Sequence, residues 1–166
     1  MTISEQYRQL NKHLHELGSY GRKGDKWAAR VRELIVEYQP TTILDYGCGQ
    51  GALGRALGIP IQEYDPAIAG KDLPPAKADL VVCTDVLEHV EPEHLDAVLD
   101  DLKRVTGKCL FAVISTRPAK KTLADGRNAH LIVEEWTFWE ERLWRRFRIK
   151  AHSANHKEVE VVLLAQ

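Results

Sequence analysis

A run of glycines in the first third of the chain has a spacing that could serve chemistry. Gly47, Gly49 and Gly51 occupy alternate positions directly after the residues ILDY. Glycine lets a backbone turn tightly and approach a ligand closely, because it has no Cβ. Asp65 follows about twenty residues later, at the end of a second apolar stretch, where an acid can hold ribose hydroxyls. The spacing therefore predicts a nucleoside-binding site.

A carboxylate just before the glycines, Asp45, narrows the choice of ligand. A dinucleotide would bring its pyrophosphate to this turn, where a nearby carboxylate would repel it. S-adenosylmethionine (SAM) carries an ammonium and a sulfonium, which a carboxylate attracts. Asp45 could instead cap the following helix, but it lies within the expected strand and not at the start of the helix. The charge pattern therefore favours SAM as the cofactor.

A second group of polar residues follows a buried stretch further along the chain. If residues 85–89 are helical, Asp85, Glu88 and His89 share one face, and His130 follows a later strand whose end points toward the same site. We expect His130, His89 and Asp85 to be catalytic, for example by taking a proton from the substrate. We expect no metal; the alternative is a divalent cation held by Asp85, Glu88, His89 and His130.

Two loops supply candidate substrate contacts. The segment 117–131 is the longest irregular stretch, and long loops commonly carry binding residues. Within it, Arg127 and Asn128 are candidates to contact the substrate; the other interpretation is that they only build the turn. Tyr20, in the loop SYGRKG, is a third candidate.

The elements that must position these residues alternate between strand and helix. Apolar spacing predicts helices over 3–17, 26–38, 92–105 and 133–147, and strands over 41–47, 59–66, 78–86 and 108–116. Two further strands form an antiparallel hairpin around 155–157. This order is typical of an α/β fold, with a Rossmann-like, mainly parallel sheet, helices on both faces and a C-terminal antiparallel hairpin.

The segments LDYGCGQG, EYDP and ADLVVCTDVLEHV resemble motifs of the class I SAM-dependent methyltransferases, and the element order is similar over roughly residues 25–166. The resemblance implies that the glycine turn holds the methionine part of SAM, that Asp65 holds the ribose and that the end of the 78–86 strand lines the site. The implied cofactor contacts are Asp45, Gly47, Cys48, Gly49, Gly51, Asp65, Pro66, Thr84, Asp85 and Val86.

The chain departs from that family between the second and fourth strands. Only the segment AIAGKDLPPAK fills this space, so the third strand is expected to be reduced or missing, with Asp72 and Leu73 as candidates for the adenine contact. The Asp85–His89 segment with His130 also looks like the metal-binding set of the small-RNA 3′-terminal 2′-O-methyltransferases, although Asp85 stands where that family has Glu.

Length and composition bound the remaining possibilities. The 166 residues predict one domain, 1–166, in which 1–24 form an N-terminal helix and loop that could act as a lid. A net charge of −1 gives no general attraction to nucleic acid or membrane. The polar N-terminus lacks a signal sequence, and three cysteines do not make a disulfide framework, so a cytoplasmic protein is expected.

These observations predict a SAM-dependent methyltransferase whose acceptor is a small molecule. One alternative is a metal-assisted RNA 3′-end 2′-O-methyltransferase, although nucleic acid is not the favoured partner. The other is a module that binds SAM without turnover.

Overall fold

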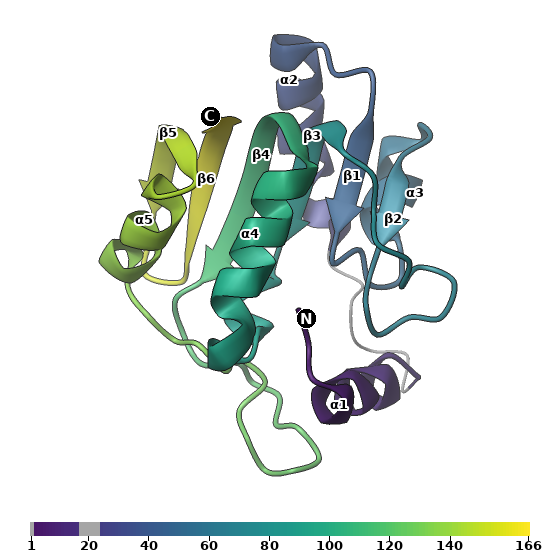
Figure 1. Ribbon diagram of the computed structural model, residues 1–166, viewed down its shortest axis with the longest axis vertical. Helices are drawn as coiled ribbons and strands as arrows, with labels where there is room; N and C mark the ends of the chain where they lie inside the picture. Colours follow the sequence, from purple (N-terminus) through teal and green to yellow (C-terminus); the bar gives the residue numbers. More distant parts are fainter. Residues whose placement is uncertain (1, 17–23) are drawn as a thin grey trace.

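The computed structural model describes residues 2–16 and 24–166 and is organised around one six-stranded sheet (Figure 1). The strands are β1 (Ile43–Tyr46), β2 (Gln62–Tyr64), β3 (Ala78–Thr84), β4 (Thr106–Ser115), β5 (Phe147–Ala154) and β6 (Glu158–Ala165). Their order across the sheet is β2-β1-β3-β4-β6-β5. The first four strands are parallel, and β6 runs antiparallel to both β4 and β5. The predicted sheet and its C-terminal hairpin are confirmed.

Helices cover both faces of this sheet. The α-helices are α1 (Glu5–Glu16), α2 (Ala28–Tyr38), α3 (Ala52–Leu57), α4 (Leu95–Val105) and α5 (Trp136–Trp144), and the short 3-10 helices are η1 (Gly24–Trp27), η2 (Leu87–His89) and η3 (Pro92–His94). Because side chains alternate along a strand, β3 contributes apolar side chains to the cores on both faces of the sheet. Leu80 and Val82 join the apolar cluster under α2 and α3, while Val81 and Cys83 join the one under α4 and α5.

The connection between β2 and β3, residues 65–77, is described in full and contains no strand. The expected loss of the family's third strand is therefore confirmed, and β2 becomes an edge strand. A tight turn follows β2 directly, with Asp65 accepting from the backbone N–H of Ile68 through its carbonyl oxygen (3.2 Å). This turn explains why the strand is shorter than the predicted 59–66.

The carboxyl ends of β1, β3 and β4 meet at one edge of the sheet, because these strands are parallel. In Figure 1, α1 lies beyond this edge, apart from the helices that cover the sheet faces. Tyr7 of α1 packs with Leu123 and Ala129 of the long loop after β4. Residues far apart in sequence thus enclose the space beyond the strand ends.

Candidate functional site

A cavity of about 710 Å³ lies at the carboxyl ends of the parallel strands, where ligands bind in open α/β sheets. Residues of α1, the glycine turn, the segments after β2 and β3, and the loop after β4 line it. All the predicted cofactor contacts line the cavity except Gly51. The predicted catalytic residues His130, His89 and Asp85 line it too.

The glycine turn follows β1 in a backbone conformation that favours glycine. The φ angles are +81° at Gly47, +50° at Gly49 and +71° at Gly51. A Cβ on Gly47 would come within 2.3 Å of a methyl carbon of Val86, so the turn also packs tightly against the segment after β3. Glycine at position 47 is therefore required both by φ and by space.

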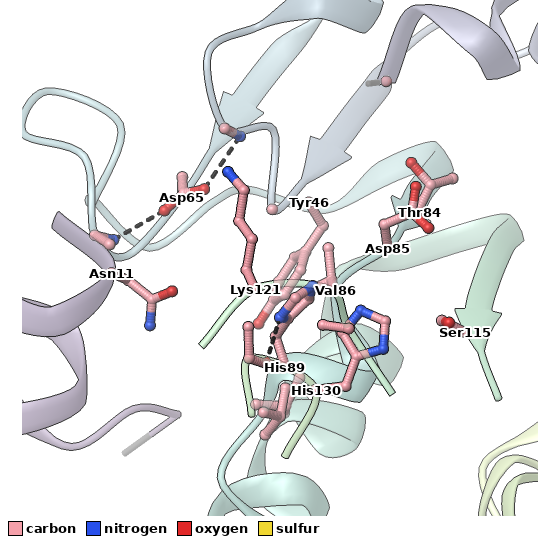
Figure 2. A pocket seen from close by; sticks show the side chains of 18 of the residues that line it. Asn11, Tyr46, Asp65, Thr84, Asp85, Val86, His89, Ser115, Lys121 and His130 are labelled. Carbon is pink, nitrogen blue, oxygen red and sulfur yellow. Dashed lines mark hydrogen bonds between the residues drawn. The ribbon is translucent and has the colours of Figure 1, made fainter. Parts of the chain in front are cut away.

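Asp65 ties the segment after β2 to the glycine turn. Its Oδ2 accepts a hydrogen bond from the backbone N–H of Gly49 (3.1 Å), and its Oδ1 accepts one from Ala67 (2.9 Å), as Figure 2 shows. Both carboxylate oxygens therefore hold backbone segments that line the cavity.

Asp45 is a buried acid on the floor of the cavity, with 4% of its surface exposed. Burial, and then the nearby charge of Glu63, raise the pKa of Asp45 to about 7, against the opposing effect of Lys71. A cationic ligand placed beside Asp45 would favour its ionised form.

Lys71 is a residue of this site that the sequence analysis missed. Its Nζ forms an ion pair with Glu63 (2.7 Å) and donates to the carbonyl oxygen of Gly49 (3.2 Å). It therefore supports the glycine turn from outside. No motif marks this lysine, since it comes from the irregular segment that replaces the third strand.

The end of β3 brings Thr84, Asp85 and Val86 into the cavity wall. Asp85 has a positive φ of +55°, and its carboxylate forms an ion pair with Lys26 (3.1 Å). Lys26 also lies 3.7 Å from a carboxylate oxygen of Glu158 on β6. Asp85 thus holds η1, the short helix that leads into α2, near the end of the sheet.

His89 and His130 lie against each other in the cavity wall, with ring centroids 4.7 Å apart and planes nearly perpendicular (Figure 2). Within the described residues they form a cluster with Glu88, in which one potential ligand atom from each residue lies within 4.8 Å of the others. Asp85 is not part of this cluster, so the four-residue ligand set considered from the sequence is reduced to three.

Two of the predicted substrate residues, Arg127 and Asn128, lie outside the cavity lining. Asn128 accepts from the backbone N–H of Ala119 and of His130 (both 2.9 Å), and Arg127 pairs with Asp125 (2.7 Å). Neither lines the cavity, so their contacts agree with the interpretation that they build the loop. Tyr20 lies outside the described residues.

The predicted adenine contacts also lie outside the cavity lining. Leu73 is 78% exposed, and Asp72 accepts a hydrogen bond from the backbone N–H of Gly70 (3.1 Å). Instead, Pro66 and Ala67 provide the cavity wall after β2. The sequence pattern could not show this, because the turn from Asp65 to Ile68 keeps Pro66 and Ala67 at the cavity while Asp72 and Leu73 lie outside its lining.

Comparison with known proteins assigns this chain to a protein family. The family described as methyltransferase domain matches residues 4–154, so the chain belongs to it. No curated protein sequence matches the chain significantly.

Solved structures of methyltransferases have a similar fold. The 1,6-didemethyltoxoflavin-N1-methyltransferase of Burkholderia thailandensis is 12% identical with a TM-score of 0.69, covering 100% of this chain and 92% of its own. Magnesium protoporphyrin IX methyltransferase of Synechocystis PCC 6803 is 16% identical with a TM-score of 0.62, covering 86% and 83%. DhpI, solved with SAH, is 14% identical with a TM-score of 0.66, covering 97% and 98%.

The family match confirms the prediction of a methyltransferase, and the fold shared with these structures confirms the predicted Rossmann-like, mainly parallel α/β sheet. In the part of the chain that the structure describes, no helix is long and apolar enough to cross a membrane.

Proposed function

We propose that this enzyme transfers the methyl group of SAM to a small-molecule acceptor bound in the same cavity. The observation that carries the proposal is the pairing of a buried acid, Asp45, with a glycine turn at the carboxyl end of the sheet. Glu63 and Asp65 add negative charge near Asp45, while Lys71 supplies the compensating cation. This end of the cavity suits the ammonium and sulfonium of SAM.

In the proposed arrangement, the donor lies along the glycine turn with its ribose at Asp65. Thr84, Asp85 and Val86 form the wall beside the sulfonium, and the acceptor takes the part of the cavity lined by His89 and His130. Methyl transfer is then an in-line displacement, in which the acceptor atom bonds to the methyl carbon as the carbon–sulfur bond breaks and SAH leaves. Positioning supplies much of the catalysis, since the sulfonium is already activated.

His130 and His89 are proposed to act on the acceptor. The Nδ1 atom of His130 lies 2.6 Å from the carbonyl oxygen of Arg117, and that of His89 lies 2.7 Å from the carbonyl oxygen of Ala129. A carbonyl oxygen only accepts, so both Nδ1 atoms carry the proton and both Nε2 atoms keep a lone pair. Either Nε2 can then take the proton that a hydroxyl or ammonium acceptor loses. Asp85 is proposed to position this side of the cavity through Lys26.

The small size of the acceptor rests on two observations. The cavity lies under α1, since Ile3, Tyr7 and Asn11 contribute to its lining. The structures of similar fold named above include a 1,6-didemethyltoxoflavin-N1-methyltransferase and a magnesium protoporphyrin IX methyltransferase, whose names give small-molecule acceptors. We also propose that residues 1–24 act as a lid and that the enzyme works in the cytoplasm, where the thiols of its three buried free cysteines would stay reduced.

Calorimetric titration with SAM and with SAH tests the donor site. We expect both to bind to the wild type and neither to bind to Gly49→Val, because a branched side chain at a φ of +50° would distort the turn. Circular dichroism checks that the variant is folded. Methyl transfer from radiolabelled SAM to a panel of small hydroxyl, amine and thiol compounds then tests turnover. A wild type that binds no SAM would overturn the proposal.

A further inference from the structure

A buried carboxylate with an incomplete set of partners lies behind the cavity wall. Glu88 of η2 is fully buried, and its Oε1 accepts a hydrogen bond from the backbone N–H of Ser115 (3.1 Å). Its Oε2 is also buried but has no hydrogen-bond partner among the described residues. An unpartnered carboxylate oxygen in the interior costs free energy, so a cation or a hydrogen-bond donor beside this atom would stabilise the protein.

Two imidazoles next to this carboxylate are oriented as metal ligands commonly are. The Nδ1–H of His89 and of His130 each donates to a backbone carbonyl oxygen, at 2.7 Å and 2.6 Å. In metal sites such a second hydrogen bond fixes the tautomer and the ring orientation, and it leaves Nε2 as the coordinating atom. The same arrangement is present twice here, on two segments separated by about forty residues.

The three groups also converge. One carboxylate oxygen of Glu88 and one nitrogen of each histidine lie within 4.8 Å of one another. Ligand atoms around a tetrahedral Zn²⁺ at about 2.0–2.1 Å lie roughly 3.3–3.5 Å apart, so modest side-chain rotations would complete the site. His89 and His130 line the cavity, which leaves the remaining coordination positions on the side of the acceptor.

We propose that Glu88, His89 and His130 form a binding site for a divalent transition-metal ion of the Zn²⁺ type, with Glu88 Oε2 and the two Nε2 atoms as ligands. Two imidazoles and one carboxylate with an open position suit Zn²⁺ and neighbouring transition metals better than Mg²⁺ or Ca²⁺, which prefer oxygen ligands. The ion would supply the missing partner of Oε2. In the metal-bound state the histidine nitrogens hold the ion instead of taking a proton from the acceptor.

The test is calorimetric titration of Zn²⁺ into the 166-residue protein after treatment with EDTA and dialysis. We expect one ion per chain, and we expect Co²⁺ to produce the visible absorption of a low-symmetry, nitrogen- and oxygen-ligated ion. His130→Ala should weaken Zn²⁺ binding at least about tenfold, because it removes a ligand. His156→Ala is the matched control, since His156 is an exposed histidine in the hairpin turn and should leave the affinity unchanged.

Glu88→Gln provides a second variant, because glutamine keeps an oxygen for the N–H of Ser115 but loses the negative charge. We expect it to weaken Zn²⁺ binding as well; if circular dichroism shows it unfolded, His130→Ala decides alone. Wild type that binds no Zn²⁺, or equal Zn²⁺ affinity in His130→Ala, would overturn the inference. SAM titrations of the same samples keep this outcome separate from the donor site, which does not involve these ligands.

Discussion

The backbone N–H of Gly49 donates a 3.1 Å hydrogen bond to the carboxylate of Asp65, which joins the turn after β1 to the segment after β2. The acid that is proposed to hold the ribose therefore also holds the glycine turn, which is proposed to contact the rest of SAM. Its two roles share one side chain, so a change at Asp65 affects both the shape of the site and its contacts.

Replacing Asp65 by alanine should weaken SAM binding by about 1–3 kcal/mol, because charge-assisted hydrogen bonds to the ribose and the anchor of Gly49 are lost together. Calorimetry with SAM measures the change. Asp65→Asn is the matched control: it keeps one carbonyl oxygen for an N–H partner, so its loss of affinity should be smaller. An unchanged dissociation constant in Asp65→Ala would contradict the role assigned to this residue.

Gly47→Ala should lower both thermal stability and SAM affinity. Its Cβ would lie 2.3 Å from a methyl carbon of Val86, in addition to the strain of alanine at a φ of +81°. Gly70→Ala separates the two causes, since Gly70 has a φ of +86° but open space around its Cβ. The control should lose about 1–2 kcal/mol from backbone strain alone. Thermal unfolding of both variants checks this; equal losses would show that the contact with Val86 is unimportant.

The pH dependence of stability should carry a contribution from Asp45. Its pKa is raised from 3.8 to about 7 in the folded protein, chiefly by burial and then by Glu63, with Lys71 opposing and Asp65 adding to the rise. Between these values the folded state holds a proton that the unfolded state has lost. The free energy of unfolding therefore falls as the pH rises from about 4 through about 7.

Asp45→Asn removes this contribution, so its melting temperature should fall less than that of the wild type over the same pH range. Scanning calorimetry of the two proteins without SAM gives the comparison. A wild type and variant with parallel pH profiles would show that Asp45 is already ionised in the folded protein across this range.

Tyr7→Phe should loosen α1 over the cavity. The hydroxyl of Tyr7 donates a 2.6 Å hydrogen bond to the carbonyl oxygen of His89, and no other atom of phenylalanine can replace it. We expect a loss of about 1 kcal/mol in stability and faster hydrogen exchange in residues 5–16. Tyr38→Phe, at the end of α2, is the control and should leave exchange in α1 unchanged. Equal exchange in α1 of Tyr7→Phe and wild type would argue against this anchor.

Much of the fold could be predicted from local patterns. The apolar runs of β3 and β4 and the amphipathic spacing of α4 each reflect burial that a short segment imposes on its own side chains. The glycine turn could also be predicted, since a backbone with positive φ favours glycine and the glycines are visible in the sequence. Boundaries were less accurate: the helix expected over 92–105 begins with the 3-10 turn Pro92–His94 and becomes α-helical only from Leu95.

The site was predicted less completely, because several of its contacts join distant segments. Lys71 supports the glycine turn from a segment without any motif, and Asp85 turns toward Lys26 instead of joining the histidines. Arg127 and Asn128 are of residue types common in binding loops, yet their side chains contact other residues of the same loop, Asp125 and Ala119.

The sequence by itself determined the order of strands and helices, the glycine turn, the acid within β1 and the acid directly after β2, because each depends on residues close together in the chain. Only the tertiary structure decided that Glu88, His89 and His130 meet and that Asp85 does not join them. That grouping depends on how the loop after β4 folds back against η2, through the backbone hydrogen bond from Ile132 to Glu88 (3.0 Å) and the contact from His89 to Ala129. Contacts of this kind are set by the packing of the whole chain, and no local pattern encodes them.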